Sequence, residues 1–122
     1  MRKRALIVDD NANNLLLEKD LLETAGLEVL TAENATSGIA LARKEVPDII
    51  IMDMRLPDMR GSDAAKILLQ YKETRDIPIV FVTASVLAEG IEEIKAIHNA
   101  VFMSKPINTR TFAKEIIQFI KT

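Results

Sequence analysis

The sequence predicts an α/β fold, a doubly wound five-stranded parallel sheet with five helices on its two faces. Four largely apolar runs, at residues 5–8, 49–53, 78–83 and 101–104, have the length and β-branched content of buried strands. Segments with helical spacing of apolar residues alternate with these runs, and the right-handed crossover rule then favours a parallel sheet. The chain of 122 residues has the length of one domain, so we expect a single domain over residues 1–122.

Composition and charge exclude several classes of function. The net charge is −2, from 16 basic and 18 acidic residues, so the chain lacks the basic footprint of a nucleic-acid-binding domain. It has no cysteine, and hence no disulfide framework and no thiolate chemistry, which fits a reducing cytosol. The apolar run after the basic start is too short for a signal peptide or a membrane span. We expect a cytoplasmic protein with no direct DNA binding and no membrane association.

The chain begins with a strand and a helix. Residues 5–8 are wholly apolar, as expected of a central strand, and the short polar side chains within 11–14 can cap a helix. That helix runs to about Ala25 and ends at Gly26, because glycine tolerates the left-handed conformation. We expect its inward face to consist of five leucines, Leu15, Leu16, Leu17, Leu21 and Leu22.

A more polar strand and a second helix follow. Residues 28–32 form a strand that is more polar than the others, which favours a place near the edge of the sheet. The second helix begins within 34–36 and ends near Glu45, with Ile39, Ala40 and Leu41 facing inward. Residues 49–53 then form a strand that is buried on both faces.

Three more helices alternate with the last two strands. We expect helices over 62–71, over 88–97 and after a cap at Asn108 or Thr109. The inward residues of the last helix are Phe112, Ile116, Ile117 and Ile120.

Polar residues stand at the carboxyl ends of four strands. Asp9 and Asp10 follow the first strand, and Asp53 ends the third. Thr83 ends the fourth strand, and Lys105 follows the fifth. The carboxyl ends of parallel strands share one edge, where ligands bind at the point at which the strand order reverses. We therefore expect these side chains to converge on one site.

The chemistry of this set points to phosphoryl transfer. Three crowded carboxylates repel one another, and a hard divalent cation such as Mg²⁺ relieves that repulsion. Lys105 can pair with Asp53 or with a phosphoryl oxygen, and Thr83 can donate a hydrogen bond to the same group. Such a site can accept a phosphoryl group on a carboxylate while the cations neutralise the developing charge.

The same residues resemble a known family. The chain is similar, over essentially its whole length, to the receiver domain of two-component response regulators, of the CheY-like single-domain type. The residues that carry the resemblance are Asp9-Asp10, Asp53, Leu56-Pro57, Gly61, Thr83-Ala84 and Lys105-Pro106. The resemblance implies a flavodoxin-like fold with strand order 2-1-3-4-5 and Mg²⁺ as cofactor.

The resemblance also implies residue roles. Asp53 would accept a phosphoryl group from a histidine kinase or phosphotransfer protein. Asp9, Asp10 and Asp53 would hold Mg²⁺ together with the backbone carbonyl of Arg55. The protein would catalyse its own phosphorylation and dephosphorylation on Asp53 as a signalling switch, without being a conventional enzyme.

A switch and an output surface follow from the same resemblance. Thr83 and Lys105 would contact the phosphoryl group, and Phe102 would become buried as Thr83 moves. We expect a receiver without an output domain, which signals by binding a downstream protein target. The binding surface would comprise helix 88–97, strand 101–104 and the last helix. The protein would be a monomer or a weak phosphorylation-dependent dimer.

Three alternatives remain. A flavodoxin-like cofactor module is disfavoured because the residues after the first strand, Asp9 to Asn11, would repel a phosphate. A phosphatase with an aspartyl nucleophile is disfavoured because Arg55 stands where a second acid would be needed. A phosphorylation-independent interaction domain on the same fold is disfavoured because the acidic set is intact.

Overall fold

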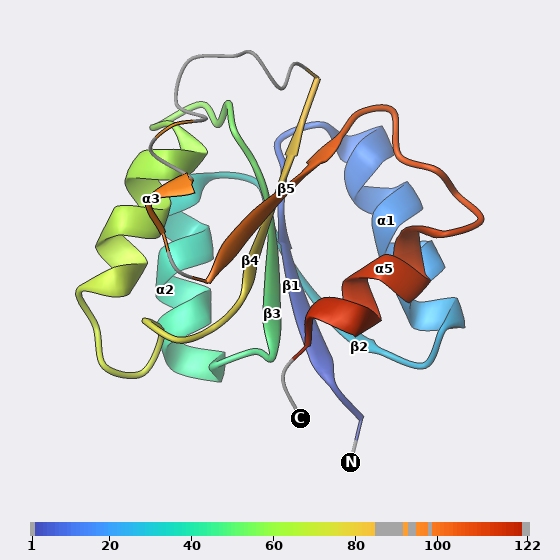
Figure 1. Cartoon of the computed structure of the whole chain (residues 1–122), viewed down its shortest axis with the longest axis horizontal. Coiled ribbons are helices and arrows are strands. Elements are labelled where there is room, and N and C mark those ends of the chain that lie inside the picture. The colour runs from blue at the N-terminus through green and yellow to red at the C-terminus, as the bar shows by residue number, and fades with distance from the viewer. Residues whose placement is uncertain (1, 85–91, 93–94, 98, 121–122) are drawn as a thin grey trace.

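Five parallel strands form the predicted sheet. The computed structural model describes residues 2–84, 92, 95–97 and 99–120. The strands are β1 Arg4–Val8, β2 Glu28–Ala32, β3 Ile49–Asp53, β4 Ile79–Thr83 and β5 Ala100–Ser104. Their order across the sheet is β2-β1-β3-β4-β5, as predicted, with β2 at one edge and β5 at the other (Figure 1).

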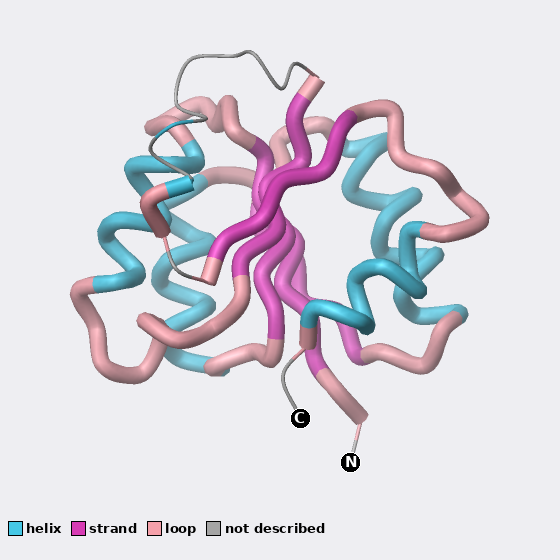
Figure 2. The backbone as a smooth tube through the Cα atoms, viewed as in Figure 1, coloured by secondary structure: helices cyan, strands magenta, loops and turns pink. Residues whose placement is uncertain are grey.

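Helices cover both faces of the sheet. They are α1 Ala12–Thr24, α2 Ala35–Glu45, α3 Gly61–Leu69 and α5 Phe112–Phe119. α2 and α3 lie on one face, and α1 and α5 lie on the other, so the molecule has three layers (Figures 1 and 2). The helix predicted over 88–97 falls mostly outside the described residues. No helix within the described part of the chain is long and apolar enough to cross a bilayer.

Alternate residues of the central strands face opposite helical layers, which explains why these runs are apolar throughout. In β3, Ile50 and Met52 join the cluster that contains residues of α2 and α3, whereas Ile49 and Ile51 join the cluster under α1 and α5. Each of the four is at most 1 % exposed. Burying such a side chain contributes about 1.5–3 kcal/mol. A one-residue slip would exchange the two faces, so the packing on both sides fixes where Asp53 lies.

Side-chain caps fix the starts of α1 and α2, the helices that follow β1 and β2. Asn11 accepts a hydrogen bond from the Asn14 N–H at 3.0 Å, and Asn34 accepts one from the Ser37 N–H at 2.8 Å. Each satisfies a backbone donor that the first turn of a helix leaves without a partner. Gly26, with φ +97°, adopts the left-handed conformation just after α1, as predicted.

The inward face of α1 differs from the prediction. Leu16 and Leu17 are 59 % and 42 % exposed, so their assignment to the core is wrong. Successive helical residues point about 100° apart, so three adjacent leucines cannot share one face. The inward stripe consists of Leu15, Leu21 and Leu22, as predicted, together with Glu18, which is only 3 % exposed. A carboxyl group therefore occupies a core position of this helix.

Two further inward assignments are wrong for the same reason. Ala40 of α2 is exposed, and the buried positions of that helix are Ala35, Gly38 and Ala42. Ile117 of α5 is 44 % exposed, whereas its neighbour Ile116 is fully buried. In both helices, consecutive apolar residues exceed what one helical face can bury.

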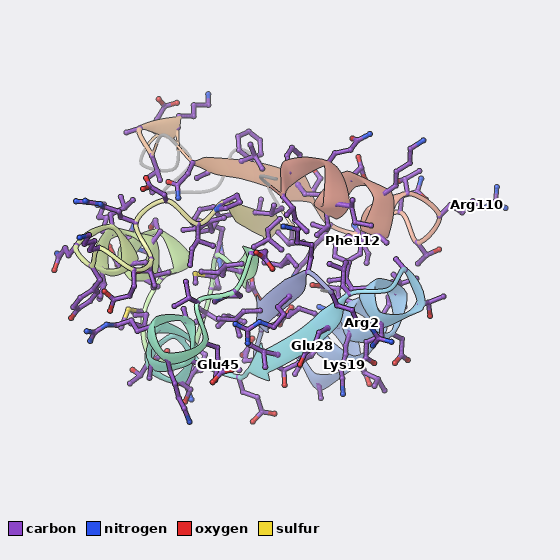
Figure 3. All side chains as sticks on the ribbon, turned by 90° about the horizontal axis from the view of Figure 1, so that it is seen from below. Arg2, Lys19, Glu28, Glu45, Arg110 and Phe112 are labelled. Atoms are coloured by element: carbon purple, nitrogen blue, oxygen red, sulfur yellow. The ribbon has the colours of Figure 1, made fainter. Side chains whose placement is uncertain are left out.

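The last helix begins later than predicted. Phe112, its first residue, is fully buried and points from α5 toward the sheet, whereas Arg110 just before it points into solvent (Figure 3). Asn108 caps a separate turn: its side chain accepts from the Arg110 N–H at 3.0 Å, and its carbonyl accepts from the Thr111 and Phe112 N–H groups. The predicted cap at Asn108 or Thr109 is therefore wrong, because this turn precedes the helix.

Candidate functional site

Three acidic residues come together at the carboxyl edge of the sheet. β1 and β3 are parallel neighbours with Val8 paired to Met52, so the residues that follow these two emerge side by side. Asp9, Asp10 and Asp53 each offer a carboxylate oxygen, and these atoms all lie within 4.8 Å of one another. Asp9 is 3 % exposed, whereas Asp10 is exposed to solvent. The cluster thus has a buried floor and an open side.

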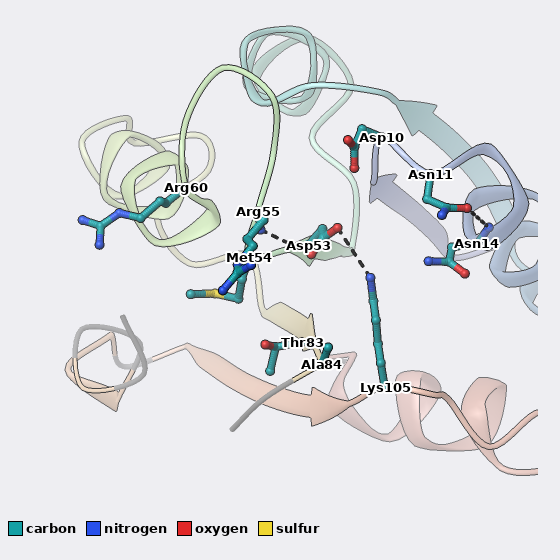
Figure 4. Close-up of a pocket in the computed structure, with 10 residues that line it drawn as sticks. All are labelled: Asp10, Asn11, Asn14, Asp53, Met54, Arg55, Arg60, Thr83, Ala84 and Lys105. Carbon is teal, nitrogen blue, oxygen red and sulfur yellow. Dashed lines mark hydrogen bonds and ion pairs between the residues drawn. The ribbon is translucent and has the colours of Figure 1, made fainter. Parts of the chain in front are cut away.

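Lys105 reaches this cluster from the end of β5. Its Nζ lies 3.5 Å from Asp53 Oδ2 (Figure 4). The same atom lies 3.8 Å from Asp9 Oδ2. Parallel pairing of β4 with β5 sets its position, because the Lys105 N–H donates to the Thr83 carbonyl at 2.8 Å. These two distances from Nζ show that one ammonium group is shared between two of the three carboxylates. The Lys105–Pro106 peptide bond is cis.

A pocket of about 650 Å³ opens at the cluster. Its lining, drawn in Figure 4, consists of Asp10, Asn11, Asn14, Asp53, Met54, Arg55, Arg60, Thr83, Ala84 and Lys105. Thr83 ends β4 in the wall of the pocket and is 4 % exposed. The guanidinium group of Arg60 points away from Asp53, and its Nε donates to Asp63 at 3.2 Å. The small side chain of Ala84 leaves the pocket open beside Lys105.

The structure brings together all but one of the residues predicted for the site. Phe102 lies on β5, two residues before Ser104, and does not line this pocket. It is 38 % exposed, as β5 is an edge strand with its side chains only partly covered. The prediction that Phe102 becomes buried concerns a second state of the protein, so it stays a prediction.

The electrostatics of the site favour a bound cation. Burial raises the pKa of the Asp9 carboxyl above its usual value, and the charges of Asp53 and Asp10 raise it further. Two groups lower the same pKa and so oppose this increase: the Asn11 N–H, which donates to Asp9 at 2.9 Å, and the ammonium of Lys105. Hard carboxylate oxygens this close to one another are the donor set that Mg²⁺ prefers. The residues present therefore fit a hard divalent cation.

The loop after β3 is closed at its base by backbone contacts. Arg55 and Arg60 form an antiparallel bridge, and the Gly61 N–H donates to the Met54 carbonyl at 2.8 Å. The Arg55 N–H also donates to Asp53 Oδ1 at 3.3 Å. These contacts hold Asp53 and Arg55 against each other on one side of the pocket.

Gly61 is the position in this loop at which a side chain has no room. A Cβ atom built on it would collide with the carbonyl oxygen of Asp53 and would lie 3.1 Å from the Met54 Cα. We expect Gly61→Ala to lower the free energy of unfolding by about 1–3 kcal/mol, as overpacking does, and to displace Asp53. Urea unfolding measures the first effect. Gly26→Ala is the control for glycine loss, because a Cβ there meets nothing within 4 Å although its positive φ is strained.

Glu18 is a site residue that the sequence analysis missed. It lines a second pocket of about 340 Å³ beside Lys105 and Ala84. Burial raises the pKa of Glu18 to about 7, and the negative charge of Asp9 contributes to the increase. The available signal was its helical spacing from Leu22, four residues later on the inward stripe. The adjacent leucines concealed that spacing.

Comparisons with known proteins agree with this geometry. The family model of the response regulator receiver domain matches residues 5–117. The polar-differentiation response regulator DivK of Brucella anthropi is 35 % identical over 120 residues, which cover 98 % of each chain. The structure of the chemotaxis response regulator CheY4 of Vibrio cholerae is 28 % identical with a TM-score of 0.91, covering 98 % of this chain and 100 % of that one.

A third relative extends the structural likeness. The receiver domain of the sensor histidine kinase PA1611 from Pseudomonas aeruginosa PAO1 is 24 % identical, with a TM-score of 0.89 and 100 % of both chains covered. Its crystal structure has a magnesium ion coordinated in the active-site cleft. At that identity the likeness supports the fold. The family-model match spans nearly the whole chain and the first relative exceeds 30 % identity, so this chain belongs to the response regulator receiver domain family of two-component systems.

Proposed function

We propose that Asp53 is the phosphoacceptor of this receiver domain. The observation that carries the proposal is the position of its carboxylate, 3.5 Å from Lys105 Nζ and within 4.8 Å of two further carboxylates at a pocket. The donor would be the phosphohistidine of a histidine kinase or of a phosphotransfer protein. Its N–P bond breaks, a bond forms between phosphorus and an Asp53 oxygen, and the imidazole nitrogen leaves.

The remaining site residues hold charge and position. Asp9, Asp10 and Asp53 would hold Mg²⁺ together with the backbone carbonyl of Arg55. Mg²⁺ would supply positive charge that stabilises the transferring phosphoryl oxygens. Lys105 pairs with the same oxygens after transfer, because it already lies beside Asp53.

Thr83 and Phe102 would form the switch. Thr83 lines the pocket at the end of β4. β4 pairs with β5, and in this pairing Phe81 is the partner of Phe102. A movement of Thr83 toward the phosphoryl group would open space that the half-exposed Phe102 can fill. The apolar side chains exposed on β5 and α5 are Val101, Phe102, Ile117 and Phe119, and they suit a protein target.

The phosphoryl donor would approach over the rim formed by α1. A phosphohistidine must come within bonding distance of Asp53, so the donor protein necessarily covers the residues around the pocket mouth. Leu17 is exposed on α1 and lines the second pocket, which lies beside Lys105. We place the protein in the cytoplasm, as a monomer or a weak phosphorylation-dependent dimer, without DNA binding of its own.

Whole-protein mass spectrometry after incubation with acetyl phosphate tests this function. We expect one phosphoryl group to be added when Mg²⁺ is present and little addition when a chelator removes it. The dependence follows because the three carboxylates repel an incoming phosphate unless a cation neutralises them. Equal labelling with and without Mg²⁺, or none under either condition, would contradict the proposal.

A further inference from the structure

Asp58 joins the loop after β3 to the start of α2. Its Oδ1 accepts a hydrogen bond from the Ala35 N–H at 2.9 Å, and its Oδ2 accepts from the Thr36 N–H at 2.8 Å. The Thr36 hydroxyl donates a third bond to Oδ2 at 2.6 Å. The partners are 22 and 23 residues distant in the sequence, so these bonds connect two separate parts of the fold.

Asp58, which accepts these hydrogen bonds, lies at the tip of the loop after β3, at the end opposite the base of the loop. The base is closed by the Gly61–Met54 hydrogen bond and the Arg55–Arg60 bridge. At the tip, Leu56 and Met59 are only partly buried against the core, and Asp58 itself is exposed. The side chain of Asp58 joins this loop to the start of α2, whereas the Arg60–Asp63 ion pair joins the loop to α3.

We propose that Asp58 is a positioning residue that holds loop 54–60 against α2, and thereby holds Arg55 and Asp53 in the arrangement that binds Mg²⁺. The proposal rests on the function proposed above, since it concerns the same metal site. Partners of metal ligands fix ligand orientation, and their loss lowers metal affinity although no ligand is removed.

A carboxylate suits this role better than other side chains. Two side chains cap the start of α2. Asn34, the residue just before the helix, accepts from the Ser37 N–H, whereas Asp58, from the loop after β3, accepts from the Ala35 and Thr36 N–H groups. The Thr36 hydroxyl and the two backbone N–H groups lower the pKa of Asp58 to about 2, so it is ionised at neutral pH. An asparagine would present one acceptor and one donor, and its amide nitrogen cannot accept from Thr36.

The test compares Asp58→Ala and Asp58→Asn with Asn34→Ala. All three weaken the cap of α2, but Asn34→Ala leaves the contact between Asp58 and the loop in place. Isothermal titration calorimetry with Mg²⁺ alone should give an affinity about tenfold lower for both Asp58 variants, the low end of effects for partners of metal ligands. Asn34→Ala should stay within about twofold of the wild type. Thr36→Val, which keeps both backbone bonds, should fall between them.

A second readout does not depend on the metal. Amide hydrogen exchange without Mg²⁺ should be faster at Arg55 and Gly61 in Asp58→Ala, and unchanged there in Asn34→Ala. Equal Mg²⁺ affinity and equal loop exchange in these two variants would overturn the inference. If the wild type binds no Mg²⁺, the proposed function fails and the metal role of Asp58 fails with it. Faster exchange at Arg55 would in that case still assign Asp58 the loop contact.

Discussion

We expect Asp53→Asn to abolish phosphoryl labelling by acetyl phosphate. The substitution preserves the shape of the side chain and its place at the end of β3, but an amide oxygen is a poor nucleophile and carries no charge for Mg²⁺. The second expected effect is a smaller increase in thermal stability on adding Mg²⁺, because a ligand that binds only the folded state stabilises it by an amount that grows with the logarithm of its affinity. Mass spectrometry and thermal unfolding measure these two results on the same samples.

Asp20→Asn is the matched control for Asp53→Asn. Asp20 is an exposed residue of α1 and takes no part in the acidic cluster. The control should be labelled as fully as the wild type and should gain the same stability from Mg²⁺. Persistent labelling of Asp53→Asn at the wild-type level would show that another residue accepts the phosphoryl group.

We expect Glu18→Gln to make the protein more stable above pH 7 and to have little effect near pH 4.5. Burial raises the pKa of Glu18 from 4.5 to about 7, so folding favours the protonated form. The favourable contribution is present below pH 4.5 and is lost as the pH rises to about 7 and beyond. A shift of this size corresponds to about 3 kcal/mol at most. Glutamine cannot ionise, so the variant avoids that loss.

Urea unfolding at pH 5 and pH 8 measures the effect of Glu18→Gln. The difference in free energy of unfolding between variant and wild type isolates Glu18, because Asp9 titrates in both proteins. Glu23→Gln is the control, since Glu23 is an exposed residue of the same helix. A gain for Glu18→Gln that is the same at both pH values would contradict the raised pKa, and so would a loss at pH 8.

Most of the fold and the convergence of the acidic residues could be predicted because their signals are local in the sequence. β3 is buried on both faces, so its residues are uniformly apolar, and its bounds agree with the prediction at both ends. Asp53 ends this strand, and the parallel topology brings the other strand ends to the same edge. A short polar residue after an apolar run was therefore sufficient to place each side chain of the acidic cluster.

The roles of Glu18 and Asp58 could not be predicted in the same way. Glu18 lies beside a run of leucines, and the run concealed which residues of α1 face inward. Asp58 contacts residues more than 20 positions away, and no periodic pattern in either segment indicates that contact. The exposure of Phe102 depends on how much of β5 its neighbours cover, which the strand's own sequence does not specify.

Chemical trapping of the phosphorylated residue tests the central claim most directly. Borohydride reduces an aspartyl phosphate to homoserine, so peptide sequencing of the reduced protein identifies the residue that carried the phosphoryl group. We predict homoserine at position 53, formed only after incubation with acetyl phosphate and Mg²⁺. Homoserine at Asp9, Asp10 or any other aspartate, with position 53 unchanged, would contradict the assignment of Asp53 as the phosphoacceptor.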